Sequence, residues 1–242
     1  MKVLFLTIGR FEGIEAHSIY PDLLREFRNN GHEVYIVVAQ EKRYGLPTAC
    51  VEENGVTILR VCIGNITKCG MIEKGISTLQ IEKQYKTAIK HFFKDTKFDL
   101  VMYSTPPITL CGVVEFIKKR DHAKSYLLLK DIFPQNAVDL GMLTKNGCNS
   151  LLYKYFRRKE KKLYFISDHI GCMSEANVRY VLKNNPEIET KKVKVCPNCI
   201  EPIDVSLTRE EIVLMRKRYN LPLNKKIFVY GEILENHREF LF

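Results

Sequence analysis

The sequence predicts an α/β fold in which a parallel β-sheet is covered by helices on both faces. Short apolar runs of strand length alternate with amphipathic stretches of helical length along most of the chain, and this order is typical of parallel sheets. The run at 34–39 is nearly continuous and rich in β-branched residues, as expected for a strand that is buried on both faces. We find no internal repeat and no low-complexity segment.

The individual strands and helices follow from the same patterns. Strands are expected at 3–8, 34–39, 56–63, 100–103, 126–129, 166–172 and 193–195. Helices are expected at 18–30, 72–93, 107–119 and 151–164, in a short segment after Ser174, and from Thr208 to Tyr219. Ser174 and Thr208 are typical N-cap residues, and Gly31 is typical of the position just after a helix.

The chain is predicted to hold one large domain and the beginning of another. Residues 1–195 contain the whole predicted parallel sheet, and 196–226 have the character of a linker with one helix. The apolar segment at 227–230 follows that linker, and twelve residues come after it. We therefore expect 227–242 to be the first strand of a second domain, followed by a tail.

The charge balance narrows the classes of partner. The 38 Lys and Arg residues against 28 Asp and Glu residues give a net charge of +10, which suits nucleic acid, an anionic membrane surface or a phosphorylated substrate. Neither zinc-finger spacing nor an aromatic-rich RNA-binding strand accompanies this charge. We expect no nucleic-acid partner.

The cysteines and the N-terminus indicate a reduced, cytoplasmic protein. Eight cysteines are scattered over 242 residues, a chain much larger than the small secreted domains that need disulfide frameworks. The apolar opening ends at Gly9-Arg10 without a small-residue cleavage site, so it is expected to be a strand and not a signal peptide. No apolar run approaches the roughly 20 residues of a membrane-spanning helix.

One cysteine pair has the spacing of a metal or redox motif, at Cys196-Pro197-Asn198-Cys199. A structural zinc site needs about four ligands, and no second pair lies at finger spacing. A redox motif of this kind is expected at a helix start after an early strand. The two cysteines are therefore expected to be incidental.

Five motifs occur in an order that is similar to one known family. They are Gly13-Ile14-Glu15-Ala16-His17-Ser18, Tyr103-Ser104-Thr105-Pro106-Pro107, Asp131-Ile132-Phe133-Pro134-Gln135, Met173-Ser174-Glu175 and Val195-Cys196-Pro197-Asn198. Together they resemble family 4 glycosyltransferases of the GT-B fold, especially those that build bacterial capsule and O-antigen sugars. The resemblance covers roughly residues 1 to 231 and implies a Rossmann-like, acceptor-side N-terminal half of that fold.

The chain departs from the family pattern after Gly231. Family members usually continue with a second glycine and a phosphate-facing loop such as Gly-Asn-Leu-Gly-Lys-Pro-Gln-Gly, whereas here the chain reads Glu232-Ile233-Leu234-Glu235-Asn236-His237-Arg238-Glu239. One base added to a suitable set of codons for 231–239 restores the family phrase. We expect a single-base deletion that truncates a longer gene, and the downstream DNA would test this.

The resemblance also implies a set of site residues. In a doubly wound sheet, ligands gather at the carboxyl ends of the strands, where loops diverge and helix N-termini point into the crevice. Asp131 is implied to orient or deprotonate the acceptor hydroxyl, and His17 to contact the acceptor or a phosphate. The residues implied to bind donor or acceptor are Gly13, Glu15, Ser104, Ser174 and Glu175.

Each of these residues also has a purely structural alternative. Gly13 and Ser104 suit turns, and His17 suits the start of a helix. Asp131 suits the cap of the turn into 132–134, and Ser174 suits an N-cap, a role that is compatible with anion binding.

The implied reaction transfers a sugar from a nucleotide-sugar donor to a sugar on a polyprenyl diphosphate carrier, with retention and without a metal or organic cofactor. The basic helix at 151–164 suits an anionic membrane surface, which implies a peripheral location on the inner face of the plasma membrane. A solvated helix is the alternative. The basic residues concerned are Lys154, Arg157, Arg158, Lys161 and Lys162.

Because the donor-gripping groups of the family belong to the absent half, we expect this chain to be inactive alone. A non-catalytic acceptor-binding or interaction module is the alternative function. A nicotinamide-dependent oxidoreductase would suit the sheet pattern, but no Gly-x-Gly-x-x-Gly follows the first strand.

Overall fold

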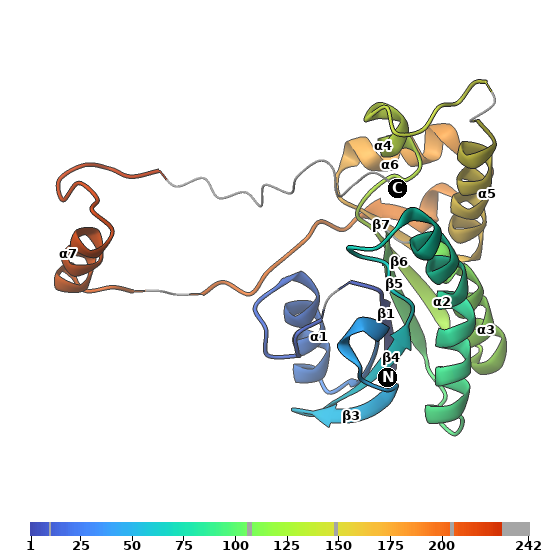
Figure 1. Cartoon of the computed structure of the whole chain (residues 1–242), viewed down its shortest axis with the longest axis horizontal. Helices are drawn as coiled ribbons and strands as arrows, with labels where there is room; N and C mark the ends of the chain where they lie inside the picture. The colour runs from blue at the N-terminus through green and yellow to red at the C-terminus, as the bar shows by residue number, and fades with distance from the viewer. Residues whose placement is uncertain (10, 106–107, 148–149, 204–205, 229–242) are drawn as a thin grey trace. The chain divides into compact units, whose positions relative to one another are not determined.

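A computed structural model describes residues 1–9, 11–105, 108–147, 150–203 and 206–228. The chain divides into two compact units, Met1–Ile200 and Glu201–Phe242. Within the described residues, the first unit holds an eight-stranded sheet in the order β3-β4-β2-β1-β5-β6-β7-β8 (Figure 1). The predicted α/β class, with helices on both faces of a largely parallel sheet, is confirmed.

The strands form where the apolar runs predict them, with one addition. Their bounds are β1 Lys2–Thr7, β2 Glu33–Glu41, β3 Ala49–Glu53, β4 Val56–Ile63, β5 Leu100–Thr105, β6 Lys124–Leu129, β7 His169–Cys172 and β8 Val193–Val195. All neighbours pair in parallel except β3, which pairs antiparallel with β4. Strand β3 was not predicted, although the Asn54-Gly55 turn that leads into β4, with φ of 47° and 78°, is a typical hairpin signal.

The helices have the bounds α1 Ile19–Asn29, α2 Met71–Phe92, α3 Cys111–Asp121, α4 Gln135–Asp139, α5 Ser150–Ile166, α6 Glu175–Asn184 and α7 Arg209–Arg218. Two predicted boundaries differ. The helix expected from Pro107 begins as the short 3₁₀ turn η2 (Ile108–Leu110) and continues as α3, while Pro107 itself lies outside the described residues. The strand expected from Ile166 starts at His169, because α5 continues to Ile166 and Ser167 Oγ then donates to the Leu163 carbonyl at 2.7 Å.

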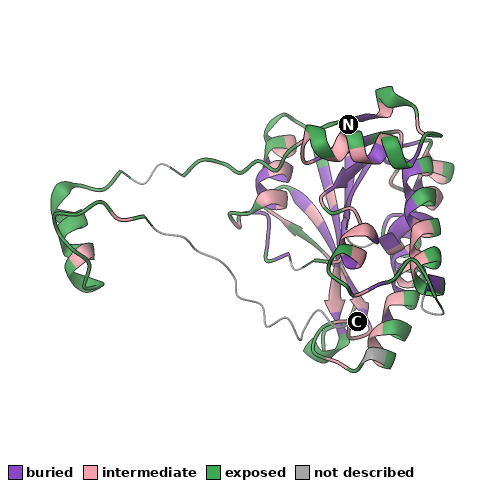
Figure 2. Ribbon diagram, turned by 90° about the horizontal axis from the view of Figure 1, so that it is seen from above, coloured by how far each residue is buried: buried purple, intermediate pink, exposed green. Residues whose placement is uncertain are grey.

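The core lies on both faces of the sheet, and Figure 2 shows the central strands as largely buried. On one face, Val3 and Phe5 of β1 pack with Leu24 of α1. On the other face, Leu4 and Leu6 pack under α2, α3 and α5 (Figure 1). Alternate β1 side chains therefore enter different halves of the core, as expected for a strand buried on both faces.

The predicted helix caps are confirmed. Ser174 Oγ accepts a hydrogen bond from the Asn177 backbone N–H at 3.3 Å. Thr208 forms a reciprocal capping box with Glu211 at the start of α7. Gly31, just past α1, has φ of +76°, the left-handed conformation that ends many helices.

A half-buried carboxylate ties the amino-terminal ends of β6 and β7 together. Asp168 Oδ2 accepts hydrogen bonds from Lys118 Nζ at 2.7 Å and from the Ser125 N–H and Oγ, both at 2.8 Å. Burial alone would raise the pKa of Asp168, but these bonds outweigh it, and the pKa lies below its ordinary value. The ionised carboxylate is thus a fixed part of the fold.

In the second unit, the described residues contain the helix α7. Ile227 and Phe228 are not in a strand, and the remainder of the predicted strand and tail, 229–242, lies outside the described residues. Among the helices that the structure describes, none has the length and apolar character needed to cross a bilayer.

Candidate functional site

Two predicted site residues meet at the carboxyl edge of the sheet. Parallel pairing places Ser104 of β5 opposite Leu128 of β6, so Asp131, two residues after β6, lies beside the end of β5. Thr105 Oγ1 is 3.5 Å from the Asp131 carbonyl oxygen. The Ser104 side chain is buried, whereas Asp131 is exposed. A hydroxyl and a solvent-accessible carboxylate therefore share one edge, as predicted.

Tyr20 joins this pair from the first turn of α1. Its ring packs on Phe5 of β1, with centroids 5.0 Å apart. Burial raises the pKa of Tyr20, the neighbouring Ser104 side chain opposes that shift, and the charge of Asp131 adds to it. Two hydroxyls and one carboxylate thus form a cluster, named here the Tyr20–Ser104–Asp131 cluster.

Sequence reasoning missed Tyr20 because an aromatic residue at the start of an amphipathic helix is ordinarily a core residue. The available signal was its position in the first helical turn after β1. In a doubly wound sheet, that turn faces the crevice at the carboxyl ends of the strands.

Ser174 and Glu175 follow β7 at the same edge. Ser174 lies two residues past the end of the strand and caps α6, while Glu175 is the first residue of that helix and is exposed. The structural alternative for Ser174 therefore holds. An N-terminus at this edge favours negative charge nearby, so an anion-binding role for this position stays a prediction.

The contacts of Gly13 and Glu15 differ from those predicted. The Ile14 N–H donates to Glu53 Oε1 at 2.9 Å, and a Cβ added to Gly13 would lie 2.5 Å from the same oxygen. Glu15 accepts a hydrogen bond from Arg28 at 2.9 Å. Since Arg28 also donates to the carbonyl of Asn54, both loop residues are fastened to the β3–β4 hairpin.

These contacts separate Gly13 and Glu15 from Asp131. Glu53 ends β3, and β3 and β6 are five positions apart in the sheet, which is roughly 24 Å at the usual spacing of about 4.8 Å. The prediction that the glycine-bearing loop and Asp131 line one wall is therefore corrected. At Gly13, the missing side chain makes room for a carboxylate of the protein itself.

A buried ion pair holds this loop in place. The Arg25 guanidinium donates to the carbonyls of Ile14 and Ala16 at 2.7 and 2.9 Å and pairs with Asp22 at 2.5 Å. The side chains of Arg25 and Asp22 are 7% and 5% exposed. Asp22 also accepts from the Ser18 N–H at 3.2 Å, so the loop before α1 is fixed to the first two turns of that helix.

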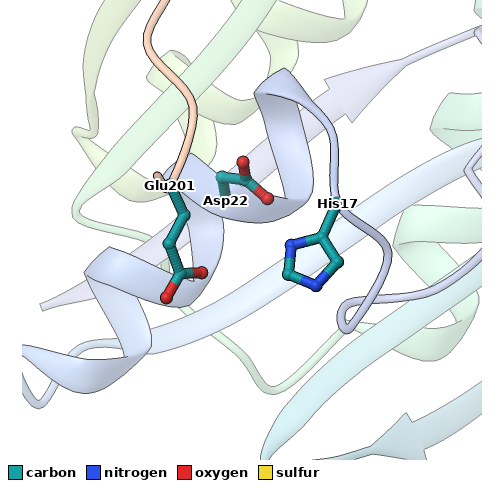
Figure 3. A group of neighbouring side chains, drawn as sticks. All are labelled: His17, Asp22 and Glu201. Carbon is teal, nitrogen blue, oxygen red and sulfur yellow. The ribbon is translucent and has the colours of Figure 1, made fainter. Parts of the chain in front are cut away.

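His17 is an exposed residue of the loop that precedes α1, and Figure 3 shows its ring and Asp22 on adjoining segments. Its position confirms the helix-start placement. Its contact with an acceptor or phosphate stays a prediction. Glu201, also drawn in Figure 3, belongs to the second unit.

The cysteine motif adjoins the same edge. The Cys196 N–H donates to the Cys172 carbonyl at 2.7 Å, and a Cβ on Gly171 would lie 2.7 Å from the Cβ of Cys196 and 2.8 Å from the Tyr126 hydroxyl. Cys196 is thus packed on the sheet, and all described cysteines are free thiols. Burial lowers the pKa of the neighbouring Lys130, against the opposing influence of the two cysteines.

Some of the basic residues on the predicted surface of α5 are engaged in ion pairs within the protein. Arg157 pairs with the buried Glu160 at 2.5 Å and donates to the Asn185 side chain at 2.7 Å, so its charge is turned inward. Lys161 and Lys162 pair with Glu187 and Glu115 at 3.0 and 2.7 Å. The inclusion of Arg157 in a lipid-facing set is therefore corrected. Lys154 and Arg158 remain exposed.

Comparison with protein-family models gives no match. Comparison with curated protein sequences gives none either. Among solved structures, sucrose-phosphate synthase from Thermosynechococcus elongatus superposes with a TM-score of 0.60 at 11% identity, covering 92% of this chain and 53% of that one.

Two further structures agree with that likeness. The E. coli trehalose-6-phosphate protein bound with UDP-2-fluoro glucose gives a TM-score of 0.54 at 10% identity, over 88% of this chain and 50% of its own. Trehalose-6-phosphate synthase OtsA gives 0.55 at 10% identity, over 88% and 51%. The chain spans about half the length of these neighbours. It has the Rossmann-like α/β fold of one half of a GT-B glycosyltransferase.

Proposed function

We propose that this chain is the acceptor-side half of a sugar-transferring enzyme of bacterial capsule or O-antigen synthesis. Residues 1–195 form the acceptor domain in this proposal, and 196–226 form the connection to a donor-binding half. The observation that carries the proposal is the Tyr20–Ser104–Asp131 cluster at the carboxyl edge of the sheet. The fold likeness to sucrose-phosphate synthase supports it.

The cluster has the chemistry needed to hold an acceptor hydroxyl. The exposed Asp131 carboxylate accepts the hydroxyl proton in a hydrogen bond, and this raises the nucleophilicity of the oxygen as the donor bond breaks. Tyr20, which is half-buried, offers a hydroxyl that donates to or accepts from a neighbouring group of the acceptor sugar. Asp131 is thus the catalytic residue of the proposal and Tyr20 a binding residue, while the buried Ser104 positions Tyr20.

The proposed donor is a nucleotide sugar, which is supported by the UDP-2-fluoro glucose bound in one structural neighbour. The proposed acceptor is a sugar on a polyprenyl diphosphate at the inner face of the plasma membrane. Stabilising the departing diphosphate needs preorganised positive groups close to it. In this proposal the donor half supplies them, and the present chain binds acceptor without turning over donor.

Titration calorimetry tests this division of roles. We expect the chain to bind a soluble polyprenyl-diphosphate sugar analogue more tightly than UDP-glucose or other nucleotide sugars. Asp131→Asn should weaken acceptor binding about tenfold or more, because a hydrogen bond to a charged group is worth roughly 1.5–3 kcal/mol. Asp95→Asn, which makes the same charge change at an exposed site, should leave binding unchanged.

The outcomes separate the competing functions. Acceptor binding that ignores Asp131→Asn would remove the cluster from the site. Tighter binding of nucleotide sugars would reverse the assignment of this half, and turnover of a nucleotide sugar by the chain alone would contradict the need for a donor half. Acceptor binding that persists without any transfer after a donor half is supplied would favour the non-catalytic binding module.

A further inference from the structure

Side chains of α2 and α5 line a groove. Figure 1 shows both helices on the face of the first unit that lies away from α1. The volume of the groove is about 470 Å³. The lining side chains that matter here are Leu79, Lys83, Lys86 and Lys90 of α2, with Tyr155 and Lys159 of α5. Thr109 of η2 also lines the groove, as do Thr78, Glu82 and Thr87 of α2.

The groove is strongly cationic. Within its described lining, four lysines face one acidic residue, Glu82. Glu82 is already engaged by Lys86 Nζ at 2.9 Å and by the Gly112 N–H at 3.1 Å. A net charge of +3 follows from the four lysines and one glutamate, and it resides on Lys83, Lys90 and Lys159.

Two of these ammonium groups rest on aromatic rings. Lys90 Nζ is 5.2 Å from the centre of the Phe116 ring, and Lys159 Nζ is 5.9 Å from that of Tyr155. Such contacts orient an ammonium group without neutralising it. Lys90 and Lys159 therefore keep their charge for an external anion.

An apolar stripe on α2 adjoins the groove. Ile72, Ile76 and Leu79 are 81%, 54% and 68% exposed, and their spacing puts them on one face of the helix. Leu151, at the start of α5, is 73% exposed. Large aliphatic side chains next to a cationic groove form an amphipathic surface, which a soluble anion alone would leave uncovered.

We propose that this face binds a bilayer that contains anionic phospholipid. Lipid phosphate lies among Lys83, Lys90 and Lys159, and the α2 stripe enters the boundary between headgroups and acyl chains. The proposal does not depend on the transfer reaction, although it suits an enzyme whose acceptor is carried by a lipid. It assigns membrane contact to α2 together with α5, and so differs from the set predicted from α5 alone.

Flotation of the full chain with vesicles tests the proposal. We expect recovery with vesicles of phosphatidylcholine and phosphatidylglycerol, and little with phosphatidylcholine alone. Replacing the three lysines with glutamine should weaken binding roughly a hundredfold, since each lysine near an anionic surface contributes about fivefold. A matched triple variant removes three exposed lysines elsewhere and should bind like wild type within about threefold, with its residual loss due to net charge alone. The two variants are Lys83→Gln with Lys90→Gln and Lys159→Gln, and Lys97→Gln with Lys119→Gln and Lys124→Gln.

A second variant tests the apolar contribution. Ile76→Ser with Leu79→Ser should lower recovery at least tenfold, because two exposed aliphatic side chains no longer enter the bilayer. All changes lie on exposed or half-exposed side chains, and equal thermal midpoints would show that folding is retained.

The proposal is overturned if both vesicle types bind equally, or if the groove variant binds like its matched control. It is also overturned if inorganic phosphate alone protects the three lysines from acetylation and vesicles add no protection. That last result would assign the groove to a free anion.

Discussion

The buried pair of Arg25 and Asp22 gives the sharpest stability prediction. Arg25→Met keeps the apolar stem of the side chain but removes the guanidinium. It leaves a carboxylate that is 5% exposed without its cation, and it takes a donor from the carbonyls of Ile14 and Ala16. Breaking a buried ion pair in this way costs about 3–5 kcal/mol.

The effect is large enough to measure by heat. For a unit of about 200 residues, each kcal/mol shifts the Tm by about 2–4 °C, so we expect the Tm to fall by roughly 6–20 °C in a circular dichroism melt. Arg158→Met removes an exposed arginine from α5 and should change stability by about 0.5 kcal/mol or less. Urea unfolding of the same proteins gives the free energies.

A double-mutant cycle identifies the cause. Asp22→Asn with Arg25→Met should cost less than the sum of the single changes, with a coupling of about 1–3 kcal/mol. Additive single effects, or a loss for Arg25→Met as small as that for Arg158→Met, would refute the view that this pair fixes the loop before α1.

Three further predictions concern contacts described above. Asp168→Asn should lower the free energy of unfolding by about 1–3 kcal/mol at pH 7. Because the pKa of Asp168 is lowered in the folded state, this contribution is present above the unfolded pKa of about 3.9 and is lost as the pH falls through the folded pKa. A difference between the urea midpoints of wild type and variant that does not narrow in acid would contradict this prediction. Gly13→Ala should cost about 1 kcal/mol of stability, since Glu53 must withdraw from a Cβ that would lie 2.5 Å away. Adding Glu53→Ala to Gly13→Ala should then lower the Tm little further, and a full additional loss of stability would argue against the contact. Gly171→Ala should cost about 1–3 kcal/mol through overpacking against Cys196, and Cys196→Gly should recover part of the lost Tm; no recovery would place the strain elsewhere.

Much of the fold could be predicted because burial in a sheet covered on both faces is visible in the local pattern of apolar residues. The continuous apolar run of β2 and the amphipathic pattern of α1 each follow from which side chains meet the core. Edge strand β3 was not predicted because Val51 and Glu52 are both exposed, so its five residues show no clear apolar pattern. The following Asn54-Gly55 pair carried the missed signal.

The part of the candidate site that follows from strand order alone could be predicted from the sequence. Residues at the carboxyl ends of neighbouring parallel strands must share an edge, and this brought Ser104 and Asp131 together. Tyr20 belongs to the cluster because α1 packs on Phe5, and no sequence motif predicts this contact. Gly13 left the predicted site because its partner, Glu53, comes from a hairpin 39 residues further along the chain from Ile14.

The sequence by itself determined the order of strands and helices, the helix caps at Ser174 and Thr208, and the edge at which Asp131 stands. The tertiary structure decided which loop reaches that edge, which lysines of α5 keep an unpaired charge, and which α2 residues join them. The physical reason is that periodicity encodes whether a side chain is buried, whereas its partner depends on which distant segment is packed against it.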